Sequence, residues 1–146
     1  MKRIIAFLIA LVAVVAAFAE YNVMLAPQQK YGGKFGYVNA NGLYVIPAKF
    51  DDARHFFNDF AAVEINGKWG FINRQGRFLV KPQYRFVMDF NRGYAIVRDF
   101  NGKWGAVNTK GELEIPCEYD RHEDLLNLKV IRLTPEQVEM LKKLGL

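Results

Sequence analysis

The stretch Gly67-Lys68-Trp69-Gly70-Phe71-Ile72-Asn73 decides the fold, because closely similar stretches occur before and after it. These are Gly33-Lys34-Phe35-Gly36-Tyr37-Val38-Asn39 and Gly102-Lys103-Trp104-Gly105-Ala106-Val107-Asn108. The copies are offset by 34 and 35 residues. A fixed period of this length is typical of a repeat protein, in which each copy is one supersecondary unit. We therefore expect three tandem repeats, at 33–66, 67–101 and 102–133.

Each copy predicts three antiparallel strands. In the first strand, aromatic residues alternate with small or branched ones, which is the period of a half-buried strand. The strand then ends in four residues that begin with Asn and close with Gly, a hairpin turn in which the Asn side chain can bond the backbone two residues on. These turns lie at 39–42, 73–76 and 108–111. We expect a mainly β fold of tandem three-stranded meanders.

The second and third strands of each copy are also predicted from the pattern. The returning strands are expected at 43–46, 78–80 and 113–115, followed by Pro47, Pro82 and Pro116. Because proline lacks an N–H donor, we expect it to end each returning strand or to place it at a sheet edge. The third strands are expected at 60–65, 94–98 and 129–133.

A glycine follows the aromatic residue in every first strand, in the pairs Phe35-Gly36, Trp69-Gly70 and Trp104-Gly105. Glycine inside a strand normally weakens it, so the repeated glycine needs a shared reason. We expect that the missing side chain lets a ring from a neighbouring strand or repeat lie flat on the backbone. The rings would then form the seam between repeats, with both tryptophans buried.

The two ends of the chain differ from the repeats. Residues 1–19 combine Lys2 and Arg3, an apolar run and a small-residue ending, which indicates a secretory signal peptide cleaved near Ala19. The alternative is an uncleaved membrane anchor, although the apolar run has 16 residues and a spanning helix needs about 20. Cleavage would lower the net charge from +5 to +3 and leave an N-terminal extension at 20–32.

At the C-terminus the pattern changes from strands to a helix. Thr134-Pro135-Glu136-Gln137 offers an N-cap, a proline at the first helical position and a capping-box glutamine. Val138, Leu141 and Leu144 follow at helical spacing. We expect a helix over 134–146 that caps the end of the repeat array.

Together these motifs resemble the WG or KWG repeat family of bacterial proteins. The resemblance covers residues 33–133 and includes the aromatic-Asp pairs Phe50-Asp51 and Tyr119-Asp120, with Phe35 in place of tryptophan in the first copy. It implies a β-rich repeat module, often exported or attached to other domains, with no established catalytic residues. We therefore name no catalytic, cofactor-binding or metal-ligating residue. The structural signature consists of Phe35, Gly36, Trp69, Gly70, Trp104 and Gly105.

Two patches of acidic residues and histidine are the sharpest candidates for chemistry. One contains Asp51, Asp52 and His55, and the other contains Asp120, His122, Glu123 and Asp124. Carboxylates and imidazoles bind divalent metals, so a metal-dependent enzyme is one alternative function. The second copy carries 84–87, Tyr-Arg-Phe-Val, at this position, so we expect plain solvated loops instead. The only cysteine, Cys117, is expected to be a packed thiol.

These observations predict an exported, non-catalytic binding or interaction module, periplasmic or secreted, monomeric and without a cofactor. Its expected partner is a protein or another component of the cell envelope. A carbohydrate or peptidoglycan binder is the second alternative, with sugars stacked on rings such as Tyr44, Phe57 or Phe86. Nucleic acid is not expected, because basic residues lie beside acidic ones in every copy. Nor do we expect stable membrane insertion after cleavage.

Overall fold

The computed structural model describes residues 24–126, 128 and 135–145. The predicted signal peptide, the predicted strand at 129–133 and the capping residue Thr134 lie outside the described residues. The chain divides into two compact units, the first ending at Lys49 and the second beginning at Phe50. No helix within the described ranges is long and apolar enough to cross a membrane.

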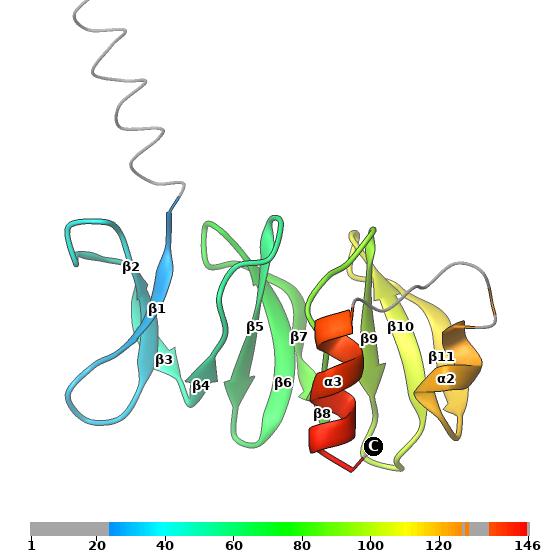
Figure 1. The fold of residues 1–146 in the computed structure, drawn as a ribbon. Coiled ribbons are helices and arrows are strands. Elements are labelled where there is room, and N and C mark those ends of the chain that lie inside the picture. The colour runs from blue at the N-terminus through cyan, green and yellow to red at the C-terminus, as the bar shows by residue number, and fades with distance from the viewer. Residues whose placement is uncertain (1–23, 127, 129–134, 146) are drawn as a thin grey trace, which may run out of the picture. The chain divides into compact units, whose positions relative to one another are not determined.

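Unit 1 contains one antiparallel sheet (Figure 1), with strand order β1-β2-β3. Its strands are β1 (Ala26–Gln29), β2 (Phe35–Val38) and β3 (Tyr44–Phe50), the last residue of which belongs to unit 2. β1 pairs with β2 so that Gln28 lies opposite Gly36. With the sequence Ala-Pro-Gln-Gln and three exposed residues, β1 suits the edge of a sheet, where proline and polar residues discourage further pairing.

Unit 2 contains two four-stranded antiparallel sheets. The first has the order β4-β5-β6-β7 and the second the order β11-β10-β9-β8. Their strands are β4 (Asp52–Ala53), β5 (Phe60–Ile65), β6 (Lys68–Asn73), β7 (Phe78–Tyr84), β8 (Phe86–Val87), β9 (Tyr94–Arg98), β10 (Trp104–Asn108) and β11 (Leu113–Tyr119). The predicted third strands at 60–65 and 94–98 are confirmed. Each pairs with the first strand of the following copy, so each of the two sheets of unit 2 joins two consecutive sequence copies.

The predicted Asn-to-Gly turns are present in all three copies. In each turn the Asn carbonyl oxygen accepts a hydrogen bond from the Gly N–H at 2.9 Å. The side-chain oxygen of Asn73 accepts two more, from the backbone N–H groups of Gln75 and Arg77, both at 3.0 Å. Asn39 and Asn108 make the same pair of bonds. These local bonds explain why the first and returning strands are joined identically in each copy.

The returning strands are longer than the sequence pattern predicts, because proline does not end them. β7 continues through Pro82 to Tyr84, and β11 continues through Pro116 to Tyr119. The register shows why: between the pairs Phe71↔Val80 and Trp69↔Tyr84 the returning strand carries two extra residues. Pro82 therefore lies in a β-bulge on an edge strand, where the missing N–H breaks no ladder bond. The expectation of an edge position was right, and that of a strand end was wrong.

The bulge also corrects the explanation for the repeated glycine. A side chain at Gly36 would place its Cβ 2.5 Å from the carbonyl oxygen of Ile46, and one at Gly105 would lie 2.5 Å from that of Ile115. At Gly70 the equivalent carbonyl belongs to Val80. The backbone of the bulged returning strand occupies the space, so the expectation that an aromatic ring lies there was wrong. Glycine is required because two backbones approach too closely for a Cβ.

One apolar core joins the two sheets of unit 2. Phe90, which follows β8, packs its ring 4.8 Å from that of Phe60 and 4.9 Å from that of Phe71, measured between ring centroids. Buried residues from both sheets complete the cluster, among them Val80 and Val97. Because each sheet has an apolar face that must be covered, the two sheets depend on each other for burial.

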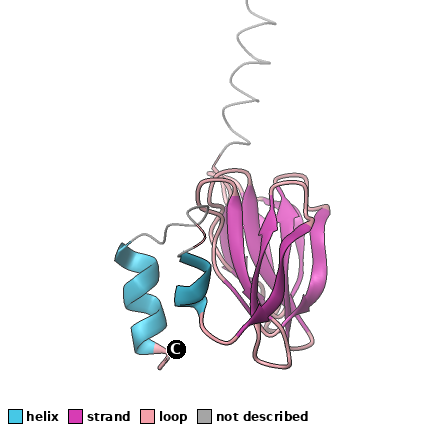
Figure 2. Ribbon diagram, turned by 90° about the vertical axis from the view of Figure 1, so that its right-hand side faces the viewer, coloured by secondary structure: helices cyan, strands magenta, loops and turns pink. Residues whose placement is uncertain are grey.

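Two helices lie on the same side of the unit 2 strands (Figure 2): α2 (His122–Leu126) and α3 (Pro135–Lys143). α3 lies within the predicted C-terminal helix and buries Leu141 in a second core cluster together with Trp104. α2 was not predicted. It replaces the short strand that the repeat would place there, since His122 is the counterpart of Val87 at an offset of 35 residues. The third copy therefore has a helix where the second has a short strand.

Candidate functional site

A cleft with a volume of about 370 Å³ lies between α3 and two loops of unit 2. We call it the α3 cleft, and its lining residues are Phe57, Asn58, Asp89, Phe90, Asn91, Glu136, Gln137 and Met140. The two loops occupy equivalent places in consecutive copies, because Phe57 and Asn91 are 34 residues apart. A mixture of apolar side chains with a few polar ones in a space of this size is typical of a ligand pocket.

The loops hold their shape through backbone bonds. Phe57 pairs with Phe60, and Asn91 with Tyr94, in isolated bridges across tight turns. Asn58 and Arg92 lie inside these turns with positive φ angles of 53° and 49°. Helix α3 is linked to the second loop by a hydrogen bond of 3.3 Å that the Gln137 side chain donates to the Asp89 carbonyl oxygen. The cleft therefore has walls fixed by secondary structure on two sides.

The acidic wall of the α3 cleft depends on Arg54. Its guanidinium lies 4.5 Å above the Trp69 ring and 5.6 Å from that of Phe86, and it donates a 2.8 Å hydrogen bond to the carbonyl oxygen of Val87. The carboxylate of Asp89 is farther away, at 3.8 Å. Burial raises the pKa of Asp89, and Arg54 offsets part of this effect. Asp89 is thus a partly buried carboxylate that Arg54 pairs with from one side.

The signature tryptophans are placed differently. Trp104 is 2% exposed, and its ring meets that of Phe86 at 6.0 Å and that of His122 at 5.5 Å. Trp69 is half-buried at the edge of the first core cluster. The prediction that both tryptophans are buried was therefore right for Trp104, whereas Trp69 is buried only in part. Phe35, the counterpart of these tryptophans in the first copy, is also half-buried.

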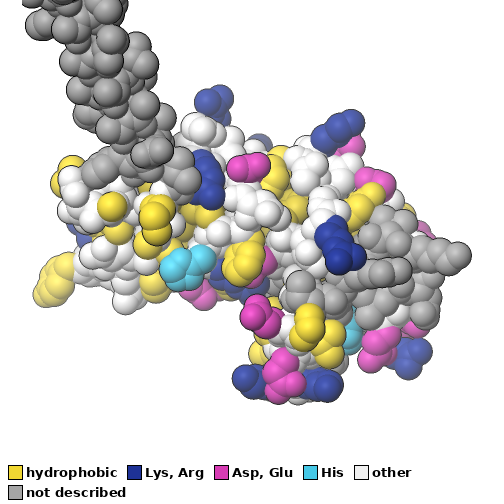
Figure 3. Space-filling view, turned by 45° about the horizontal axis from the view of Figure 1, so that its top comes forward, with side chains coloured by type: hydrophobic (Ala, Val, Ile, Leu, Met, Phe, Trp, Pro, Cys, Tyr) yellow, Lys and Arg dark blue, Asp and Glu magenta, His cyan; other side chains and the backbone are white. Residues whose placement is uncertain are grey.

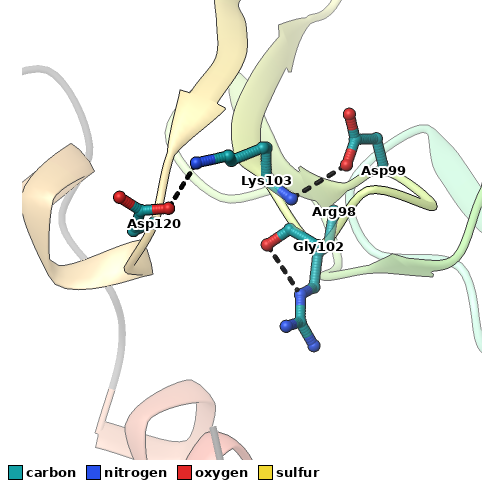
Figure 4. Close-up of polar contacts among 5 residues, drawn as sticks. All are labelled: Arg98, Asp99, Gly102, Lys103 and Asp120. Carbon is teal, nitrogen blue, oxygen red and sulfur yellow. Dashed lines mark hydrogen bonds and ion pairs between the residues drawn. The ribbon is translucent and has the colours of Figure 1, made fainter.

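A second hollow of about 420 Å³ lies beside Trp104 and includes His122, Arg121 and Gly145. Figure 4 shows the ionic contacts near it: Lys103 donates a hydrogen bond from its ammonium to Asp120 and a 2.8 Å bond from its backbone N–H to Asp99. Arg98 donates a 3.1 Å bond to the Gly102 carbonyl and lies over the Trp104 ring. Lys103 and Asp120 are paired and Arg98 is held by a carbonyl oxygen and the Trp104 ring, so we take the α3 cleft as the candidate site.

The two histidine patches are not assembled into a metal site. Among the residues described, no group of three or more His, Cys, Asp and Glu side chains is placed to hold a metal ion. His55 is exposed, whereas His122 is buried and belongs to α2, so the prediction of a solvated loop was wrong for His122. Burial lowers the pKa of His122, with Glu123 and Asp124 opposing that effect.

The carboxylates of these patches have local roles. Asp51 accepts a 2.8 Å hydrogen bond from the Asn66 N–H, and Asp52 accepts one of 2.7 Å from the Ala53 N–H. Arg121 makes ion pairs with Glu123 and Asp124. Asp51 thus stabilises a turn, Glu123 and Asp124 lie at the start of α2, and Asp52 bonds within β4; the first two are ordinary functions of acidic residues.

The three rings expected for a sugar binder are not equivalent. Phe57 is 49% exposed and Tyr44 36% exposed, on different units. Phe86 is half-buried, with Trp104 against its edge and Arg54 over its face, so this ring is not available for stacking a sugar. Cys117 is half-buried, and burial raises the pKa of its thiol, as expected for a packed cysteine.

The charge on the surface is mixed. In Figure 3, Lys and Arg side chains lie interspersed with Asp and Glu on the face shown. Ion pairs such as Arg74–Asp59 at 3.9 Å add to this mixture. On this face the basic side chains do not form a continuous stripe.

The repeated geometry, with its Asn turns and a glycine under each bulge, agrees with the comparison to known families. The WG-containing repeat matches residues 35–69, 69–104 and 104–121. The chain belongs to the WG-containing repeat family. Searches of curated proteins and of solved structures gave no match. WG repeats are repeat-type modules, so the family supports interaction rather than a named reaction.

The α3 cleft was not found from the WG pattern. Phe57 was named only as a ring that could stack a sugar and Glu136 only in the helix-capping motif, while Asp89 and Met140 were not named. The offset of 34 residues between Phe57 and Asn91 could have shown that two equivalent loops face one region. The sequence does not show that α3 packs against these two loops. Met140 of α3 packs in the same core cluster as Met88, which lies 52 positions earlier in the chain, and no local pattern indicates so distant a contact.

Proposed function

We propose that this WG-repeat protein is an exported, non-catalytic interaction module whose α3 cleft binds a protein partner in the cell envelope or outside the cell. The carrying observation is the cleft itself, which combines the half-exposed ring of Phe57 with apolar Met140 and acidic Asp89 and Glu136. Exposed aromatic and methionine side chains are enriched in protein interfaces. Membership in a repeat family supports the same conclusion.

Export is tested by the N-terminus of the protein made in a bacterial host. If residues 1–19 are a signal peptide, the chain recovered outside the cytoplasm begins at Glu20. A variant with Ala17→Asp and Ala19→Asp blocks cleavage and retains the precursor mass. An intact Met1 on the wild-type protein, recovered with the membrane fraction, would instead establish the uncleaved anchor.

The interaction is tested by photo-crosslinking from the α3 cleft. A photoreactive phenylalanine analogue at position 57 is expected to capture one envelope or secreted protein, whereas the same analogue at position 100 does not. Phe100 is the matched control because it is 52% exposed, close to the 49% of Phe57, and does not line the cleft. Equal capture from both positions would show nonspecific contact and count against the proposal.

Binding of a glycan would be a different outcome of the same comparison. Sedimentation with purified peptidoglycan that is lost in Phe57→Ala and Tyr44→Ala, but retained in Phe100→Ala, would favour the carbohydrate alternative. The covered face of Phe86 leaves unit 2 with fewer rings for such stacking than expected. We therefore place the protein partner first.

A further inference from the structure

We propose that the α3 cleft takes a lysine or arginine side chain of the partner protein, with an apolar residue beside it resting on Phe57 and Met140. This inference rests on the proposed function and specifies the chemistry of the partner. Three features of the described residues support it: the acidic lining of the cleft, the contacts that hold Arg54 in place, and the apolar lining beside the carboxylates.

The charge of the cleft is the first argument. Of its eight lining residues, two are acidic, Asp89 and Glu136, and none is basic. The cation near Asp89 is Arg54, whose guanidinium is 3.8 Å from the carboxylate. A positive side chain entering the cleft would meet two carboxylates and no cation in the lining. Complementary charge of this kind selects the partner and speeds association.

The engagement of Arg54 is the second argument. Its guanidinium is held over the Trp69 and Phe86 rings and donates a 2.8 Å bond to the Val87 carbonyl oxygen. It is therefore fixed behind Asp89 and cannot swing into the cleft without losing these contacts. Asp89 therefore has Arg54 on its inner side, and a partly buried carboxylate gains from a second cation on the side that faces the cleft.

The apolar side of the cleft is the third argument. Phe57 offers a half-exposed ring, and a cation over an aromatic face is attracted by the ring quadrupole. Lysine and arginine also carry long methylene stems that pack on apolar surface. Phe90 and Met140 supply that surface, and the volume of about 370 Å³ accommodates more than one side chain. An acidic partner residue would be repelled by both carboxylates.

The probe for this proposal is a set of three capped pentapeptides that carry lysine, glutamine or glutamate between two leucines. We expect the lysine peptide to shift the backbone amide NMR signals of Phe57, Asp89 and Met140. Its affinity should exceed that of the glutamine peptide by at least about fivefold and fall as sodium chloride rises. The glutamate peptide should bind most weakly. Equal affinity of all three, or shifts confined to other residues, would overturn the proposal.

Two charge variants separate recognition from folding. Glu136→Gln removes an exposed carboxylate from the cleft and should weaken the lysine peptide about fivefold. Asp89→Asn should weaken it further. Glu112→Gln is the control, because Glu112 is also a carboxylate but lies in the turn before β11, outside the cleft. Retained affinity in Glu136→Gln and in a folded Asp89→Asn would overturn the cationic ligand.

The same variants distinguish this failure from failure of the proposed function. If position 57 captures a partner and the capture survives both charge variants, the interaction module stands and the cationic ligand is wrong. If position 57 captures nothing specific while the lysine peptide still binds with the expected selectivity, the cleft chemistry stands and the exported partner is wrong. Each result therefore decides one of the two claims.

Discussion

Trp69 and Trp104 occupy the same place in two consecutive WG repeats, yet their surroundings differ. Trp69 is half-buried and covered by the guanidinium of Arg54. Trp104 is 2% exposed and lies in a cluster with Met88, the residue 34 positions after Arg54. The repeat thus fixes the strand and the glycine that follows each tryptophan, while the neighbouring elements decide how far the indole ring is buried. The most deeply buried tryptophan is the one closed off by helices.

The largest expected effect is the loss of the Trp104 ring. Trp104→Ala should lower the free energy of unfolding by about 3 to 5 kcal/mol, because it leaves a cavity among Met88 and Leu125. Trp69→Ala should cost about 1 to 3 kcal/mol, because its ring is only partly removed from water. Urea denaturation of residues 20–146 measures both. Phe100→Ala, at an exposed ring, should stay within about 0.5 kcal/mol of wild type.

Equal losses for the two tryptophans would mean that the helices add nothing to the cover of Trp104. In that case α2 and α3 would be docked too loosely to count as part of the core. Leu141→Ala would then also be nearly neutral, although this side chain is 1% exposed.

The glycines that face the bulged returning strands should show the next effect. Gly70→Ala should destabilise unit 2 by about 1 to 3 kcal/mol or more, because its Cβ would meet backbone atoms of Val80, Lys81 and Pro82. Gly105→Ala should cost less, because one of its three near contacts is the Cys117 side chain at 2.9 Å, which can rotate away. Lys68→Ala, on the same strand but exposed, serves as the control.

Thermal unfolding of the two alanine variants side by side makes this comparison. A neutral Gly70→Ala would show that the bulge can open and that the close approach of the strands is not obligatory. A greater loss at Gly105 than at Gly70 would show that the Cys117 side chain is as rigid as the backbone beneath it.

A smaller change should follow when the cover of Trp69 is made to resemble that of Trp104. Arg54→Met removes the 2.8 Å bond to the Val87 carbonyl and the contact over the Trp69 ring. The net loss should be about 1 kcal/mol, since a methionine restores part of the apolar contact. Urea denaturation measures the loss. A stabilised Arg54→Met would mean that the guanidinium is kept for Asp89 and the α3 cleft rather than for stability.

The parts of the fold that follow from local rules could be predicted from the sequence. The Asn and Gly residues at 73–76 specify their turn through bonds within four residues, and the alternation in 69–73 specifies the strand. The long returning strands could not be predicted, because the bulge that accommodates Pro82 is set by pairing with β6. For the same reason the glycine was explained by a ring, when the actual neighbour is a backbone.

The candidate site was less predictable than the fold. The α3 cleft needs the docking of a helix onto two loops that are distant in sequence, and no spacing encodes that contact. α2 was missed although a signal existed. When the copies are aligned, His122 is equivalent to Ala53 and Val87, which are both apolar and buried. Leu125 follows three residues later, on the same face of a helix. Aligning the apolar residues of the first two copies with position 122 would have predicted a buried residue there in place of a solvated loop at 120–124.

The smallest effect concerns this buried histidine, where the last repeat differs most from the one before it. Burial against Trp104 lowers the pKa of His122 in the folded state, below the ordinary value of about 6.5 in the unfolded chain. Between these two values the unfolded chain binds more protons than the folded one, so the free energy of unfolding rises with pH through this window and levels off above about pH 6.5.

His122→Val, which installs the residue of the preceding copy, should remove this contribution to the pH dependence. Urea denaturation of both proteins from about pH 5 to about pH 8 isolates it as a difference, because the carboxylates are common to wild type and variant. The free energy of unfolding of the variant minus that of the wild type should rise as the pH falls, since only the wild type carries an imidazole whose protonation is disfavoured by folding. A constant difference across this range would mean that Glu123 and Asp124 fully offset the effect of burial on the pKa of His122. The charged imidazole would then cost the folded state no stability at this position.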